Sequence, residues 1–337
     1  MNKTYIMILG TALLALAACS RDEVKEIGNE PLIDFRIAVD TRATETTTDN
    51  IQSFFVTAID ETGAVYFKDV EYSDADNDGS FTSESPFYWP AGGSLKFYAY
   101  APGSTRLGGT VAISNEAQTL TGYTVPADFS NHADFVTAYA EGSKAENATG
   151  VELAFEHRFS QIEVRARNTN QGYVYKVAGV KFGKVASTGG FDFRSSEWND
   201  LGTKTNFVSE YDAAVSIDAT AKSIMGANGN AMMLPQTLTG WENESDKTNT
   251  AEGSYISVKV SIKTASGMTV YPTDATTGYG WVAVPVSNTW EAGKHYIYTL
   301  DFTTGAGMTD PDGPDEPDPV FEGAIKFSMD TEVIGWQ

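Results

Sequence analysis

Two residues near the start of the chain could take part in covalent chemistry. Cys19, the only cysteine, follows Leu16-Ala17-Ala18 at the end of a short apolar segment, a lipobox-like arrangement. We expect residues 1–19 to act as a lipoprotein signal peptide, with acyl chains attached to Cys19. Arg42 lies in a polar run without an apolar pattern, which a protease could cut between Arg42 and Ala43. The alternative is that Arg42 is an ordinary loop residue.

Residue types that serve catalysis are sparse. The histidines His132, His157 and His295 stand far apart, and none has the spacing of a zinc-ligand motif. We expect His157 to be packed or hydrogen-bonded near a turn. The chain contains neither a GxSxG elbow nor a GxxxxGK[ST] loop. The sequence therefore predicts that this protein is not an enzyme and needs no cofactor.

An acidic loop is the one candidate for a metal site. Asp74, Asp76 and Asp78 match the first positions of a calcium-binding loop. The bidentate glutamate of such a loop belongs at position 85, whereas Glu84 stands one residue earlier and no flanking helices are expected. We interpret the segment as a solvated hairpin loop, with a calcium site as the alternative.

The last residues of the chain have the alternation of a half-buried strand. Ile325, Phe327, Met329, Thr331 and Val333 fall on one face, and the residues between them are polar or charged. The preceding stretch, residues 309–319, holds four prolines and five acidic residues. Such a stretch should stay extended over roughly 30 Å. A strand on this tether, without a neighbouring partner in the sequence, is suited to complete the sheet of another molecule.

A strand with a matching pattern stands near the other end of the chain. Ile33, Phe35, Ile37 and Val39 share one face of it. Cleavage after Arg42 would release this strand and open its groove, and the last strand of another subunit could then fill that groove. The alternative is that the first and last strands pair with each other inside one domain.

Composition favours an exported, β-rich protein. The formal net charge is −22 and the pI about 4.4, so nucleic acid and anionic lipid would repel the chain. Short apolar segments alternate with turn residues, which is typical of β-sandwiches. A polar stretch over residues 141–150 indicates a linker, and we expect a domain break near residue 148. The expected strands are 54–59, 65–70, 95–100, 134–139, 151–155, 162–166, 173–182, 231–234, 255–263, 280–284 and 295–302.

Several motifs together resemble one family. They are Tyr88-Trp89-Pro90 followed by Gly92-Gly93, the stretch from Val151 to Ile162, Met233-Leu234-Pro235-Gln236, and the stretch from Trp290 to Tyr298. Their order, combined with the lipobox and an arginine before the first domain, resembles the fimbrillin family. The short acidic run after Cys19 also resembles a surface-export signal of lipoproteins. The resemblance extends from the lipobox to the last strand.

The resemblance implies a fold and a mode of assembly. Fimbrillins are subunits of type V pili in Bacteroides-type bacteria, and they fold as two transthyretin-like β-sandwich domains. An arginine-specific protease removes the lipidated end with the first strand, and the terminal strand of a partner fills the groove. The implied organisation is all-β: signal peptide 1–19, N-terminal segment with removable strand 20–42, sandwiches 43–148 and 149–304, Pro/Asp-rich linker 305–319, and donor strand 320–337.

The expected partners and location follow from the same resemblance. The precursor would be an outer-membrane lipoprotein carrying palmitate, and the mature protein part of a cell-surface fimbria that supports cell adhesion. Partners would be other pilin subunits, the protease, the outer membrane through the lipid, and a host or bacterial surface receptor, but no nucleic acid. The sequence leaves open whether the chain is a stalk, anchor or accessory subunit.

Two rival interpretations stay open. The first is a surface lipoprotein that binds glycan without polymerising, with Trp198, Trp241 and Trp281 stacking on sugars, although packing in a core or loop is the simpler role for those side chains. The second is a glycan-degrading enzyme. A terminal strand on a Pro/Asp-rich tether serves a pilin and has no use in either rival.

Overall fold

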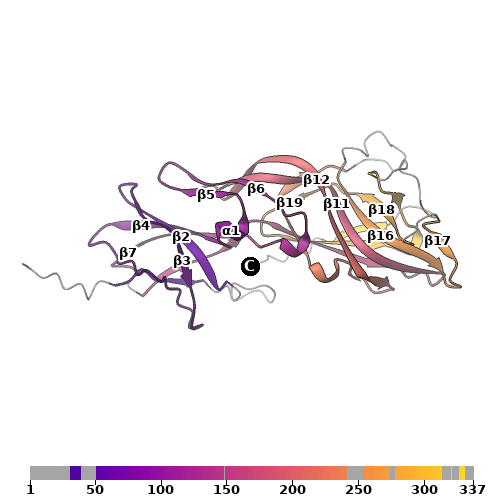
Figure 1. Ribbon diagram of the computed structural model, residues 1–337, viewed down its shortest axis with the longest axis horizontal. Helices are drawn as coiled ribbons and strands as arrows, with labels where there is room; N and C mark the ends of the chain where they lie inside the picture. The colour runs from indigo at the N-terminus through magenta and orange to yellow at the C-terminus, as the bar shows by residue number, and fades with distance from the viewer. Residues whose placement is uncertain are drawn as a thin grey trace, which may run out of the picture.

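The computed structural model is an elongated all-β molecule, which confirms the predicted fold class at this level (Figure 1). It describes residues 31–38, 51–147, 149–240, 253–273, 278–312, 320 and 326–330, the last of these for the backbone alone. Helical turns within these ranges are α1 (Ser104–Leu107), η2 (Phe129–Asn131), η3 (Gly226–Asn228) and η4 (Phe302–Thr304). Among the described residues, no helix has the length and apolar character needed to span a membrane.

The strands follow one another with short turns between them. The part of the chain up to residue 160 contains β1 (Phe35–Ile37), β2 (Ser53–Asp60), β3 (Val65–Ser73), β4 (Ser94–Ala101), β5 (Thr110–Ile113), β6 (Gln118–Thr124), β7 (Val136–Ser143), β8 (Val151–Leu153) and β9 (Glu156–His157). The remainder contains β10 (Ser160–Arg167), β11 (Tyr173–Asp192), β12 (Glu197–Ile217), β13 (Lys222–Ser223), β14 (Ala231–Met233), β15 (Gln236–Leu238), β16 (Tyr255–Thr264), β17 (Thr269–Tyr271), β18 (Gly280–Pro285), β19 (Asn288–Trp290), β20 (His295–Asp301), β21 (Met308–Thr309) and β22 (Lys326–Asp330).

The first sheet has the order β3-β2-β4-β7-β9 and is antiparallel throughout. On β4, the fully buried residues Leu95, Phe97 and Ala99 share one face, as the alternation predicts. Tyr98 and Tyr100 lie on the opposite face and are buried as well. β7 runs on to Ser143, so the expected linker at residues 141–150 begins inside a strand. A strand tolerates polar residues here because cross-strand pairing with β4 satisfies its backbone.

A long hairpin of β11 and β12 runs from the end of the molecule that carries β16 to its middle, where β5 and β6 lie (Figure 1). The first part of β11 pairs with β16, and its last part pairs with β6. The resulting sheet has the order β21-β18-β16-β11-β6-β5, with β12 also on β11 and β17 on β16. Neither β12 nor the pair β5 and β6 was expected from the sequence. β12 is largely exposed and polar, so it lacks the apolar face that a sequence pattern detects.

A third sheet contains β22, the last strand among the described residues. Its order is β13-β10-β20-β22, and β14 also pairs with β10. β10 and β20 are parallel, with Gln161 opposite His295 at the start of the register. β22 is antiparallel to β20 and lies at the end of this sheet.

Two large clusters of buried apolar side chains form most of the core of the described residues, and Tyr255 with Ala283 forms a small third cluster. The smaller of the two large clusters contains residues between 33 and 155, and the larger one contains residues between 59 and 306. Val151, Leu153 and Phe155 belong to the smaller cluster, whereas Leu120 and Phe135 belong to the larger one. The two clusters therefore interleave along the chain around residue 148, and the predicted domain division there stays a prediction.

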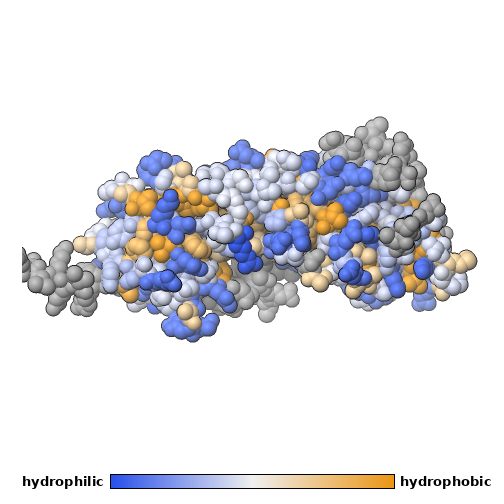
Figure 2. All heavy atoms as spheres, in the orientation of Figure 1, coloured by the Kyte–Doolittle hydropathy of each residue, from blue (hydrophilic) through white to orange (hydrophobic). Residues whose placement is uncertain are grey.

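Exposed hydrophobic side chains also gather in separate areas of the surface. Figure 2 shows hydrophobic side chains over the end of the molecule that carries β2 and β4, and again over its middle, with hydrophilic surface between them. Single exposed apolar residues are common on soluble proteins, so these areas by themselves do not define a binding site.

Candidate assembly site

The first strand is held on both of its flanks. On one side, β1 pairs in parallel with β8, with Phe35 opposite Val151 and Ile37 opposite Leu153. On the other side, Phe35 and Phe81 exchange backbone hydrogen bonds of 3.2 and 2.9 Å, and the Ile33 N–H donates to the Phe87 carbonyl at 2.8 Å. The strand therefore behaves as an interior strand, although it is only three residues long.

The apolar side chains of this strand fill the smaller cluster. Ile33 and Phe35 are buried and Ile37 is partly buried, while Arg36 on the opposite face of the strand is exposed. The Phe35 ring meets Tyr72, Phe97 and Phe54 edge-on, with centroid distances of 4.7, 5.2 and 6.0 Å. Edge-to-face pairs of this kind add about 0.5–1.5 kcal/mol each beyond the area they bury. Removal of Phe35 would thus empty the centre of an aromatic cluster.

The residues expected to control release of this strand lie just beyond it. The last described bond joins the Ala38 N–H to the Leu153 carbonyl at 2.9 Å. Val39, the cleavage pair Arg42 and Ala43, and the lipidation residue Cys19 lie outside the described residues. Their roles stay predictions.

The last strand has a partner within its own chain. β22 pairs with β20, with Phe327 opposite Leu300 and Met329 opposite Tyr298. The expectation that no nearby segment pairs with it is therefore wrong for this conformation, because β20 would otherwise present an open edge. Ile325, Thr331 and Val333 lie outside the described residues. The first and last strands do not pair with each other in the described structure, because β1 lies on β8.

The first residues of the tether before the last strand are bound to a sheet. Ala306, Met308 and Asp310 are buried, and β21 pairs with β18 at Ala283 and Val282. Residues 313–319 lie outside the described part of the chain. The proline and aspartate content predicted an extended segment. It did not predict that the first residues of this segment are bound to a sheet.

A cavity of about 700 Å³ opens where several strands of the first sheet end. Phe55, Asp69, Arg106, Asp134 and His157 are among its lining residues. The Asp134 carboxylate lies 2.6 Å from His157 Nδ1. Burial raises the pKa of the Asp134 carboxyl, and the neighbouring His157 opposes that rise. His157 is thus hydrogen-bonded, as predicted, and lies within the short strand β9, but its partner 23 residues earlier could not be read from the sequence.

The acidic loop has the compact form expected of a hairpin loop. Carboxylate oxygens of Asp74, Asp76 and Asp78 lie within 4.8 Å of one another. The Asp74 carboxylate accepts the backbone N–H groups of Asp78 and Gly79, both at 3.0 Å. These bonds explain the turn without a cation, and the calcium site stays an untested alternative.

The tryptophans proposed for sugar stacking have packing roles where they are described. Trp198 stacks on Phe159 at 5.3 Å, and its Nε1–H donates to the Arg158 carbonyl at 2.6 Å. The Trp281 ring lies 4.8 Å from Lys181 Nζ, a cation–π distance. Trp241 lies outside the described residues. Both described tryptophans therefore agree with the simpler interpretation, packing.

The described residues thus form an all-β molecule with a strand of similar alternating pattern near each end of the described chain. The model of the fimbrillin-like family matches residues 41–313, most of the chain, and this chain belongs to that family. This match confirms the predicted family, and because the fimbrillin-like family is non-enzymatic, it also confirms the prediction that the chain is not an enzyme. The matched range ends before β22 and begins after β1.

Solved structures share the fold. A protein from Bacteroides uniformis, described as a candidate cell adhesion protein, superposes with a TM-score of 0.51 at 13% identity, covering 91% of this chain and 98% of that one. A second candidate cell adhesion protein, from Parabacteroides distasonis, gives a TM-score of 0.50 at 11% identity, covering 89% and 96%. At such identities the likeness concerns the fold alone. No curated protein matches this chain.

Proposed function

We propose that this protein is a structural subunit of a type V pilus that polymerises by protease-triggered strand exchange and supports adhesion. The precursor is held at the outer membrane by lipid on Cys19 and is cut between Arg42 and Ala43. β1 then leaves, and the terminal strand of another subunit enters its groove. The observation that carries the proposal is the burial of Phe35 at the centre of an aromatic cluster, on a strand that ends just before Arg42.

The two strands are matched in side-chain size as well as in alternation. Aligned in the same direction, Ile33, Phe35 and Ile37 correspond to Ile325, Phe327 and Met329. A phenylalanine would therefore replace a phenylalanine in the aromatic cluster, and flexible methionine would adapt to the site of an isoleucine. Each apolar side chain that becomes fully buried contributes roughly 1.5–3 kcal/mol, which favours filling an empty groove.

In the uncut chain the groove and the last strand are both paired within the same molecule, which would keep the precursor monomeric. β1 occupies the groove in the uncut chain, and β22 is paired with β20. Exchange therefore requires one covalent event, cleavage, and two conformational events, the departure of β1 from its groove and of β22 from β20. Because β1 can leave only after cleavage, polymerisation would begin only once the protease has cut the chain.

The proposal is tested by digesting the purified precursor with an arginine-specific protease, followed by mass analysis and an unboiled sizing gel. We expect a new N-terminus at Ala43 and a ladder of heat-labile multimers. Mass analysis matters because Arg36 is also exposed, but cutting there would require β1 to open first.

Two variants control this experiment. Arg42→Gln should remain monomeric after treatment, and deletion of residues 320–337 should be cut yet form no multimers. Multimers from either variant would contradict strand exchange.

A second candidate function is glycan binding without polymerisation, favoured by the 700 Å³ cavity that combines Phe55 with hydroxyl and carboxylate side chains. A chain that resists cleavage at Arg42, stays monomeric and binds glycans in an array would support it over the pilus proposal.

A further inference from the structure

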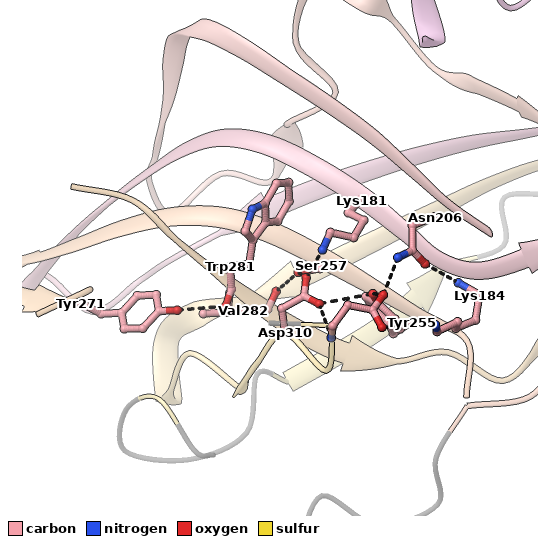
Figure 3. A network of polar contacts seen from close by, with 10 residues as sticks. Lys181, Lys184, Asn206, Tyr255, Ser257, Tyr271, Trp281, Val282 and Asp310 are labelled. Carbon is pink, nitrogen blue, oxygen red and sulfur yellow. Dashed lines mark hydrogen bonds and ion pairs between the residues drawn. The ribbon is translucent and has the colours of Figure 1, made fainter. Parts of the chain in front are cut away.

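The segment that leads to the last strand is held at Asp310 by a network of ion pairs and hydrogen bonds. Asp310 is only 4% exposed, yet it carries a carboxylate. Its Oδ2 lies 2.5 Å from Lys181 Nζ and accepts the Ser257 hydroxyl at 2.8 Å (Figure 3). A buried charge is tolerated only when it is paired and hydrogen-bonded, so this set of contacts is specific to a carboxylate at position 310.

A second carboxylate of the same segment is bound next to the first. Asp312 Oδ2 accepts the Tyr255 hydroxyl at 2.6 Å, and its Oδ1 lies 3.2 Å from Lys184 Nζ. The same hydroxyl lies 3.3 Å from Asp310, so one tyrosine joins both carboxylates (Figure 3). Burial, together with the two aspartates, raises the pKa of Tyr255, which keeps its hydroxyl protonated and able to donate.

The neighbouring backbone is built to receive this network, which we call the linker clamp: Lys181, Lys184, Tyr255, Ser257, Asp310 and Asp312. The Tyr255 ring lies against Gly183, where a Cβ would approach ring atoms to 2.1 Å. Glycine at 183 therefore lets the ring reach the two carboxylates. The Asp310 N–H donates to the Trp281 carbonyl at 3.3 Å, and β21 pairs with β18 directly before the clamp. Side chains and backbone together hold the chain up to Asp312.

We propose that Asp310 and Asp312 are positioning residues that fix the root of the donor strand, so that the arm passed to a neighbouring subunit starts after Asp312. The inference rests on the proposed function. Residues 313–325, at about 3.3 Å per extended residue, would then give the strand a reach of about 40 Å. Two of the five acidic residues in the linker thereby act as an attachment, and the remaining three belong to the arm.

A fixed root predicts that arm length and clamp strength compensate for each other. The arm is shortened in steps, by deleting residues 315–316, 315–318 or 314–319, until the multimer yield of the cleaved protein falls. Loss of four residues shortens the arm by about 13 Å, while opening the clamp would free residues 308–312 and return about 15 Å. Lys181→Met is combined with Asp310→Asn, because removing only one partner would leave a buried charge unpaired.

The expected result is a rescue. Shortening lowers the multimer yield about tenfold, and adding the clamp double variant returns it to within about threefold of the full-length arm. If the linker clamp only stabilised the fold, the combined variant would give a lower multimer yield than the shortened variant. The matched control is Asp218→Asn with Lys222→Met, which removes the exposed pair at 2.7 Å and should not rescue. Failure of the clamp variant to rescue, or no loss of yield from any deletion, would overturn the inference.

Hydrogen exchange separates this inference from the proposed function. In the uncut monomer, the amides of residues 308–310 and 312 should be protected, and the clamp double variant should exchange there about tenfold faster without a change at β4. Unchanged protection would overturn the fixed root even if multimers form. Absence of multimers from the cleaved wild-type chain would instead reject strand exchange. The hydrogen-exchange result would still decide whether the chain is anchored at residues 308–312.

Discussion

The first and last strands carry nearly the same sequence pattern and occupy unlike positions. β1 has backbone partners on both flanks and buries Phe35 in an aromatic cluster. β22, within the described residues, pairs only with β20 at the end of its sheet. An edge strand can leave by breaking one row of hydrogen bonds, whereas an interior strand leaves a hole in the core. Alternation therefore indicates a strand with one buried face, whereas the neighbouring strands determine how readily that strand can leave the sheet.

The strongest test of this comparison locks the last strand in place. Thr299 and Ser328 are opposite each other in the register of β20 and β22, so Thr299→Cys with Ser328→Cys should form a disulfide. We expect the oxidised, cleaved protein to form no multimers and the reduced protein to form them normally, on an unboiled gel. Each single cysteine variant serves as the control. Multimers from fully oxidised protein would show that β22 need not leave β20.

A stability measurement compares the two strands directly. Phe35→Ala should lower the free energy of unfolding of the uncut precursor by about 3–5 kcal/mol, because it empties a fully buried aromatic site. Phe327→Ala should cost about 1 kcal/mol in the same precursor, as expected of a strand at a sheet edge. Urea unfolding with matched m-values gives both numbers. Equal losses would contradict the difference in position.

Acidification should weaken the sheet of β22 and leave β1 in place. His132 Nδ1 accepts the Met232 N–H at 3.0 Å, and so ties the loop before β7 to β14. Burial lowers the pKa of His132, while its contact with Pro126 and the charge of Asp128 partly oppose this. Because the folded state favours the neutral ring, its stabilisation is full above the unfolded pKa near 6.5 and is lost as pH falls toward the lowered folded pKa.

The variant His132→Gln isolates that effect. We expect the stability of the wild type to drop by about 1 kcal/mol more than that of the variant between pH 7 and 5, by urea unfolding. The raised pKa of Asp134 is common to both proteins, so it cancels in the difference. Parallel pH profiles would refute a role for His132.

The smallest effect concerns surface charge beside the last strand. Arg167 Nη2 lies 2.9 Å from Asp301 Oδ2, at the β20 position opposite Lys326. Arg167→Gln should change the free energy of unfolding by less than about 1 kcal/mol, and less still in high salt. A loss of several kcal/mol would mean that charge, rather than backbone pairing, holds this part of the sheet.

Most of the strands could be predicted because their apolar residues alternate. β2, β4, β16 and β20 each carry a buried face, and their positions agree with the expected ranges within a few residues. β12 could not be predicted, because its conformation depends on pairing with β11 rather than on its own side chains. Local pattern therefore found most of the strands that build the core, but it missed β5 and β6 as well as β12, whose conformation depends on its neighbour.

The candidate site could likewise be predicted only in part. Sequence alone pointed to Ile33, Phe35 and Ile37 as one face of a strand, and to a Pro/Asp-rich stretch before the last strand. It could not reveal that β8, more than a hundred residues later, lies beside β1, or that Asp310 meets Lys181. Contacts between distant segments depend on the whole topology, which no local spacing encodes.

The sequence by itself determined the alternation of the two terminal strands, the acidity of the chain, its β class and its family motifs, because these depend on residue type and short-range order. Only the tertiary structure decided that the first strand is enclosed, that the last strand is paired at an edge, and that two linker aspartates form ion pairs, of which Asp310 is buried. The physical reason is that burial and pairing are properties of surroundings assembled from remote parts of the chain, so the same alternating pattern can fill a core or line an edge.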